Sequence, residues 1–152
     1  LVWSIKQEST AMIKVAFAST DRSRVNQHFG AAEGFVIYEV TPDKATLVGV
    51  GEFAEEAMDG NEDKLTAKVD FLEGCAAVYV MAIGASAIKK LMAKGVQPIR
   101  INEIDAVDDL LGEISKAMND GGVAWIERAI TAQTKAKAED RFANMAEEGW
   151  EG

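Results

Sequence analysis

Cysteine, histidine and proline are all scarce in this chain of 152 residues. It has one cysteine, Cys75, one histidine, His28, and two prolines. A single cysteine excludes an intramolecular disulfide, so burial and hydrogen bonding must hold the fold, which suits a reducing compartment. The chain also has no paired-cysteine spacing, which disfavours a zinc site or a self-contained iron–sulfur site.

Long apolar runs and an excess of basic residues are absent too. The longest runs, such as Ala76 to Ile83, are far shorter than the roughly 18 to 20 residues that a membrane helix needs. Residues 1–11 lack the basic start and continuous apolar stretch of a secretory signal. The formal net charge is −9, with no basic stripe. We therefore expect a cytoplasmic protein with neither a membrane nor a nucleic acid as its partner.

The composition is that of a globular protein, with 48% hydrophobic and 27% charged residues. A single core is usually complete within about 100 to 150 residues. We predict an N-terminal tail (1–11), one α/β domain (12–130) and a C-terminal helical extension (131–152). The extension is rich in Ala, Lys and Glu and has few large apolar residues.

The hydrophobic pattern predicts five strands and a series of helices. The strands are Ile13–Ala18, a hairpin of Gly34–Val40 with Ala45–Phe53, a buried central strand over Ala76–Ile83, and Val96–Ile101 as the last. The first predicted helix runs through Leu65, Val69 and Leu72 and is capped by Asn61. The second extends from Gly84 to Gly95, with Ile88, Leu91 and Met92 on one side. A third covers Asp105–Met118, and a short helical piece follows from Trp125 to Ile130. The strand–helix–strand order predicts a parallel crossover.

His28 lies in a polar loop, Ser19–Gly30, at the carboxyl end of the first predicted strand, where α/β folds place ligands. Imidazole is a good ligand for iron, so one open-sided histidine could hold a preformed cluster. A local hydrogen bond or plain exposure is the alternative. Arg22 and Arg24, close by in an acidic chain, could neutralise an anionic ligand. They could equally be solvated or paired with acids.

Two further positions are candidates. Cys75 could offer a thiolate to a soft metal, although a lone cysteine is more often a small buried hydrophobe. Gly84-Ala85-Ser86 could present free N–H groups at a helix start to an anion, or form a plain turn. No phosphate loop, dinucleotide fingerprint or nucleophile elbow is present, so we expect no enzyme.

Several stretches resemble the dinitrogenase iron-molybdenum cofactor-binding family, most closely its NifX-like branch. They are Lys14–Ala18, Val25–Gly30 with its His-Phe-Gly element, Asp59–Leu65, Gly74-Cys75, Ile83–Ala87 and Lys94–Ile99. The resemblance covers about residues 12–130.

The resemblance implies an α/β fold of the ribonuclease H-like type: three layers, with helices flanking a five-stranded mixed sheet that has one antiparallel hairpin strand. It implies that the chain binds iron-molybdenum cofactor or its iron–sulfur precursor. The family's cofactor-binding histidine maps onto His28. The expected cofactor-binding residues are His28, Arg22, Arg24, Asn26, Phe29, Gly30, Gly84 and Ser86, and the expected metal ligands are His28 and Cys75.

By the same resemblance, the favoured docking partner is a scaffold for cofactor assembly, with the precursor synthase and apo-dinitrogenase as further candidates. Two other classes of function stay open. One is a cofactor-free interaction module that regulates partner assembly. The other is a small hydrolase using His28 or Cys75, which the missing motifs disfavour.

Overall fold

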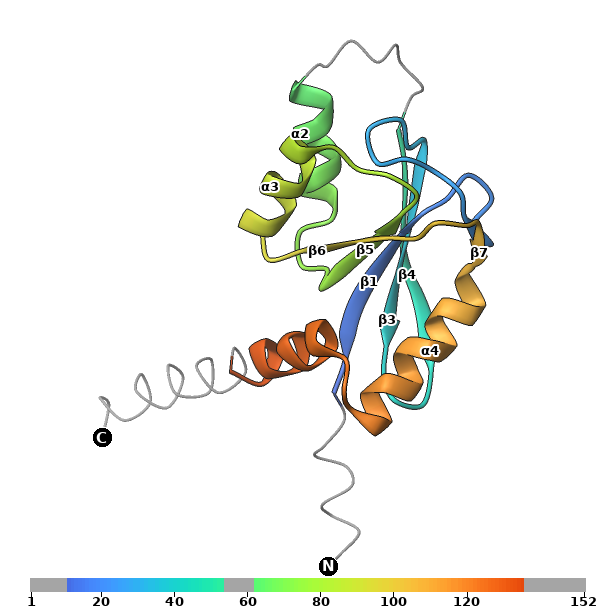
Figure 1. Ribbon diagram of the computed structural model, residues 1–152, viewed down its shortest axis with the longest axis vertical. Coiled ribbons are helices and arrows are strands. Elements are labelled where there is room, and N and C mark those ends of the chain that lie inside the picture. Colours follow the sequence, from blue (N-terminus) through green and yellow to red (C-terminus); the bar gives the residue numbers. More distant parts are fainter. Residues whose placement is uncertain (1–10, 54–61, 136–152) are drawn as a thin grey trace, which may run out of the picture.

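The structure, a computed structural model, describes residues 11–53 and 62–135 (Figure 1). The strands are β1 (Ile13–Ala18), β2 (Arg24–Val25), β3 (Gly34–Val40), β4 (Ala45–Glu52), β5 (Ala77–Val80), β6 (Gln97–Arg100) and β7 (Asp105–Ala106). The helices are α2 (Glu62–Phe71), α3 (Ala85–Ala93), α4 (Val107–Asp120) and a further one over 124–135. The predicted N-cap Asn61, residues 1–10 and residues 136–152 lie outside the described part.

Five strands form one mixed sheet in the order β4-β3-β1-β5-β6. β3 is antiparallel to both β1 and β4, while β5 is parallel to both β1 and β6. One hairpin strand therefore runs against the other four, which confirms the predicted mixed sheet and the parallel crossover. β5 is buried along its whole length, as predicted, but β1 and not β5 is the middle strand.

Helices cover both faces of the sheet and give three layers (Figure 1). α2 and α3 lie over one core cluster, which includes Phe29, Phe35 and Leu91. α4 and the helix over 124–135 lie over the second, which includes Phe17 and Tyr79. None of the helices in the described ranges is long and apolar enough to cross a membrane.

Two predicted details of the helices are wrong. α4 begins at Val107 and not at Asp105, because Asp105 and Ala106 form β7, which pairs with β2 in the loop after β1. α3 buries Ala87 and Leu91, whereas Ile88 and Met92 are 37% and 53% exposed. This short helix packs between α2 and β6, so only a narrow stripe of it meets the core.

The helix over 124–135 runs through the predicted domain boundary at residue 130. Ile126 is buried in the second cluster, and the Gln133 side chain accepts a hydrogen bond from the backbone N–H of Met12 at 3.0 Å. The start of the predicted extension is thus attached to the start of β1. The limits of the domain stay a prediction.

Candidate functional site

The site lies at the carboxyl ends of β1 and β5, two adjacent parallel strands. From β1 the chain continues to β3 on one side of the sheet, and from β5 it continues through α3 to β6 on the other. Open α/β sheets commonly bind ligands beyond the carboxyl ends of their strands. The loop with His28 follows β1 and lies beside the segment that follows β5.

The backbone around His28 is fixed against the segment that follows β5. Gln27 accepts a hydrogen bond from the N–H of Met81 at 2.9 Å, and Phe29 donates to the carbonyl of Ala82 at 2.8 Å. These bonds make a parallel bridge between His28 and Ala82. The His28 side chain is exposed, and no hydrogen bond or ion pair of its imidazole is found among the described residues. The backbone of His28 is therefore fixed, and its imidazole is accessible.

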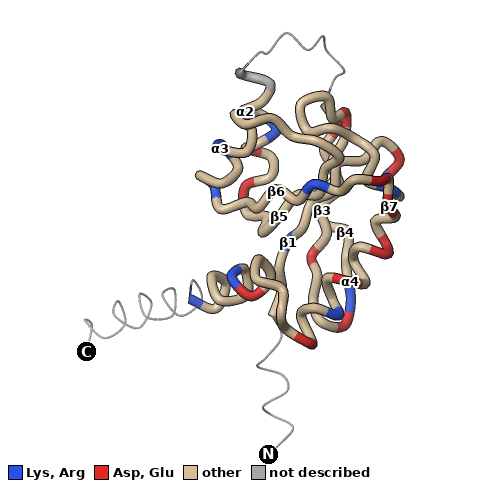
Figure 2. Tube along the Cα trace, viewed as in Figure 1, with Lys and Arg blue, Asp and Glu red and all other residues tan. Residues whose placement is uncertain are grey.

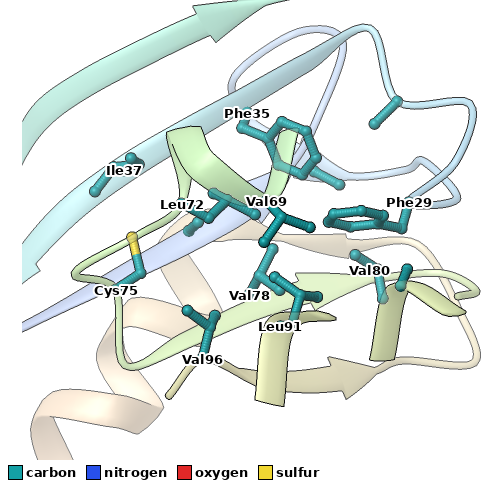
Figure 3. Packing of buried hydrophobic residues seen from close by; sticks show 14 residues of the cluster. Phe29, Phe35, Ile37, Val69, Leu72, Cys75, Val78, Val80, Leu91 and Val96 are labelled. Carbon is teal, nitrogen blue, oxygen red and sulfur yellow. The ribbon is translucent and has the colours of Figure 1, made fainter. Parts of the chain in front are cut away.

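The side chain of Phe29 anchors the loop in the hydrophobic core. Its ring is fully buried and packs against Phe35 at a centroid distance of 5.6 Å. Phe35 contacts Phe53, which contacts Phe71 of α2, so a chain of aromatic rings ties the loop to the α2 layer. The side chain of Phe29 therefore belongs to the core (Figure 3) and not to a ligand-contacting surface, which corrects its expected role in cofactor binding.

Lys68 of α2 is a functional candidate that the sequence analysis missed. Its side chain is 7% exposed, and its ammonium group donates to the carbonyls of Gly30 at 2.8 Å and Phe29 at 3.5 Å. Lys68 occupies the i+3 position of the apolar stripe Leu65, Val69 and Leu72. A lysine at an apolar position of a helix could have indicated this contact, because a buried ammonium group needs hydrogen-bond acceptors. It holds the His28-Phe29-Gly30 segment on the helix.

Asp21 organises the first half of the loop. Its carboxylate accepts hydrogen bonds from the N–H groups of Ser23 and Arg24 at 2.9 and 3.0 Å, and from the Arg24 guanidinium at 2.9 and 3.1 Å. These bonds hold the pKa of Asp21 far below its usual range; the bond from the Ser23 N–H has the largest effect and the bond from the Arg24 side chain the next largest. The guanidinium of Arg24 is thus already occupied by a carboxylate.

Arg22 differs from Arg24. Its backbone has a φ of 67°, the left-handed region that few residues other than glycine adopt, and its N–H donates to the Ser19 hydroxyl at 2.9 Å. Its guanidinium lies 3.8 Å from Glu52, a long contact between two exposed groups. Such a surface pair is weak, so this guanidinium can turn toward another anion.

The remaining predicted site residues fall into two groups. Asn26 links two parts of the loop: its side-chain amide accepts a hydrogen bond from the Thr20 N–H at 3.1 Å and donates one to the Thr20 hydroxyl at 2.8 Å. Gly84 and Ser86 are exposed at the start of α3, two and four residues after the bridge at Ala82. Gly30 is also exposed. A Cβ at Gly30 or Gly84 would meet nothing within 4 Å, so a ligand can approach both backbones.

Cys75 is not part of this site. It precedes β5, at the opposite end of that strand from Ala82, and is 4% exposed in the core cluster (Figure 3). Burial raises the pKa of its thiol to about 11, so the group is protonated at neutral pH. The structure does not bring His28 and Cys75 together, and it places Cys75, an expected metal ligand, in the core, as in the alternative interpretation of this residue. Within 11–53 and 62–135, no group of three or more His, Cys, Asp or Glu side chains could hold a metal ion.

The chain belongs to the dinitrogenase iron-molybdenum cofactor family, whose model matches residues 11–117. It is 46% identical over 145 residues to protein NifX of Azotobacter vinelandii, covering 95% of this chain and 91% of that protein. It is 36% identical over 108 residues to the FeMo cofactor biosynthesis protein NifB of Frankia alni, covering 68% of this chain and 21% of NifB. The resemblance to the NifX branch inferred from the sequence is confirmed.

The fold is also found among solved structures. The crystal structure of PH0822 superposes with a TM-score of 0.54 at 22% sequence identity, covering 68% of this chain and 88% of that one. At this identity the likeness supports the mixed α/β architecture.

Proposed function

We propose that this protein binds an iron–sulfur nitrogenase cofactor, iron-molybdenum cofactor or its precursor, and carries it during cofactor biosynthesis without catalysing a reaction. The family and the NifX relatives support a role in this biosynthesis. The match to about a fifth of NifB indicates that a module of this kind also occurs within a longer protein named for FeMo cofactor biosynthesis. The ribonuclease H-like relationship is part of the same proposal.

The observation that carries the proposal is the exposed His28 imidazole on a fixed backbone at the carboxyl ends of β1 and β5. Imidazole ligates iron through a neutral nitrogen, and a preformed cluster needs only an open coordination position to accept it. Since the loop is already ordered, little conformational entropy is lost when the cluster binds.

The neighbours of His28 suit an anionic cargo. The guanidinium of Arg22 is weakly engaged, and the start of α3 at Gly84 and Ser86 carries the partial positive charge of a helix N-terminus. In this proposal Arg24 acts through Asp21 by positioning the loop. A single protein ligand permits release, because fewer bonds have to break when the cargo moves to the next protein.

The partner implied by this role is the nitrogenase cofactor assembly machinery. A scaffold for cofactor assembly would receive or supply the cluster, and the precursor synthase and apo-dinitrogenase are further candidates. Docking at the carboxyl ends of β1 and β5 would place a partner's ligand beside His28.

Anaerobic titration of the apo-protein with isolated cluster, followed by visible absorption, tests the site. His28→Ala should weaken binding by more than about tenfold, because even residues that only orient a metal ligand contribute 10- to 100-fold. The control is Thr46→Ala, which alters an exposed side chain at the opposite end of the sheet. This variant should bind the cluster with the affinity of the parent protein.

Equal affinity of the His28→Ala and parent proteins would refute the site. If the parent protein captured assembly partners equally well with and without cluster, and did not bind the cluster, the cofactor-free interaction module would be the better explanation.

A further inference from the structure

A cavity lies at the end of the sheet opposite to His28. It has a volume of about 600 Å³ and opens at the amino ends of β1, β5 and β6. Its walls are the helix over 124–135, the end of α3 and the first residues of β1. This volume falls within the range of small-molecule sites, about 300 to 1,000 Å³. Nothing in the proposed carrier role uses this cavity.

The charge of the lining is opposite to that of the protein. None of the lining residues is acidic, while Lys14, Lys94 and Arg128 are basic, in a chain with a net charge of −9 (Figure 2). Lys94 is engaged by Glu73 at 3.1 Å and Asp70 at 3.6 Å. Lys14 and Arg128 make no ion pair within the described ranges. The cavity thus offers two cations to an incoming anion.

The rest of the lining is mostly apolar. Trp125, Met12 and Met92 provide an indole and two thioethers, and Trp125 is held by an edge-to-face contact with Tyr79 at 6.4 Å. Cys75 also lines the cavity, and its protonated thiol adds no negative charge. An aromatic wall with flexible methionines favours a flat or irregular apolar body.

The frame of the cavity is fixed by backbone hydrogen bonds. Ala76 donates to the carbonyl of Lys14 at 2.7 Å, and Gln97 donates to the carbonyl of Ala76 at 2.9 Å. The bond from Met12 to Gln133 joins the strand side of the cavity to the helix side. A preformed cavity loses little entropy on binding a ligand.

We propose that this cavity binds a small organic carboxylate with an apolar or aromatic body. The carboxylate is bound by Lys14 and Arg128, since a guanidinium fork matches both carboxylate oxygens and an ammonium group adds a point charge. The body lies against Trp125 and Met92. The site is separate from His28 and independent of the cluster.

The probe is 2-naphthoate, with the neutral 2-naphthalenemethanol as its analogue, titrated into the full chain by calorimetry and by ¹⁵N amide shifts. We expect 2-naphthoate to bind with a Kd below about 1 mM, a modest affinity for a ligand of this size. The alcohol should bind about tenfold more weakly. Shifts should cluster at the amino ends of β1 and β5 and around Trp125.

Arg128→Gln and Lys14→Gln should each weaken 2-naphthoate binding by about five- to tenfold. Both side chains are exposed, so the folds should persist, as near-ultraviolet circular dichroism checks. Lys116→Gln removes an exposed charge from α4, outside the cavity, and should change nothing; His28→Ala should also leave binding intact.

Four results would overturn the proposal, three of which concern the probe itself. These three are absence of saturable binding, equal affinity for the alcohol, and equal weakening by Lys116→Gln. Binding of acidic peptides but not of 2-naphthoate would also overturn it, because the surface would then serve a protein partner.

Discussion

Replacing Phe29 by alanine tests whether the His28 loop is anchored in the core. The Phe29 ring is fully buried and contacts Phe35, which in turn contacts Phe53. Truncation of a buried phenylalanine costs about 3 to 5 kcal/mol through lost apolar burial and the remaining cavity. We expect about 4 kcal/mol here, because neighbouring rings that are fixed by their own contacts cannot fill the space. Domains of this size are stable by only about 5 to 15 kcal/mol.

Urea unfolding at 25 °C, followed by far-ultraviolet circular dichroism, measures the loss as a lower midpoint with a similar slope. Ile104→Ala is the control: this side chain is 54% exposed, so its loss should stay within about 0.5 kcal/mol. If Phe29→Ala does not fold, Phe29→Leu keeps most of the apolar volume and should cost about 1 to 2 kcal/mol. A cost below about 1 kcal/mol for Phe29→Ala would refute the anchoring role.

Further predictions concern two glycines and alkaline stability. Gly34→Ala should cost about 1 to 3 kcal/mol by urea unfolding, because its Cβ would lie 2.7 Å from the Ser19 carbonyl oxygen. Gly112→Ala, within α4 and with open space around it, should instead stabilise by up to about 1 kcal/mol; equal effects would contradict this reasoning. Burial raises the pKa of Cys75 from 9.0 to about 11 and that of Tyr79 from 10.0 to about 12. The unfolded chain therefore ionises first, and the free energy of unfolding should fall by about 2 kcal/mol per group as pH rises from 9 to 12. Cys75→Ala should reduce the fall in the free energy of unfolding between pH 9 and 11. An unchanged fall in this range would refute the assignment of the pH dependence to Cys75.

Much of the sheet was predictable from local patterns. The bounds of β1 and β3 match the prediction, because runs of β-formers end at turn residues that no tertiary contact overrides. β5 was identified as buried from its continuous apolar sequence. Its place beside the middle strand was not predictable, because strand order is set by packing between segments far apart in the chain.

The place of the candidate loop in the fold was predictable, but its contacts were not. The loop after β1 could be assigned to the ligand-binding end of the sheet from strand order alone. The pairing of β2 with β7 and the bond from Lys68 to Gly30 join residues that are 38 or more positions apart, so no local pattern reports them. The Asp21–Arg24 contact is local, but a sequence does not show which acid an arginine selects.

The exposure of His28 follows from how firmly its neighbours are bound. Gln27 and Phe29 hold the segment after β5 through their backbones, Phe29 fills the core, and Gly30 is bonded to buried Lys68. The His28 side chain is exposed between these fixed neighbours. In the proposed carrier role, ordering of the loop would therefore take no free energy from the bond to a cargo. A carrier with one protein ligand depends on this, because a mobile loop would lower an already modest affinity. Loosening the loop at Phe29 should therefore weaken cluster binding even though its ring never touches the cluster.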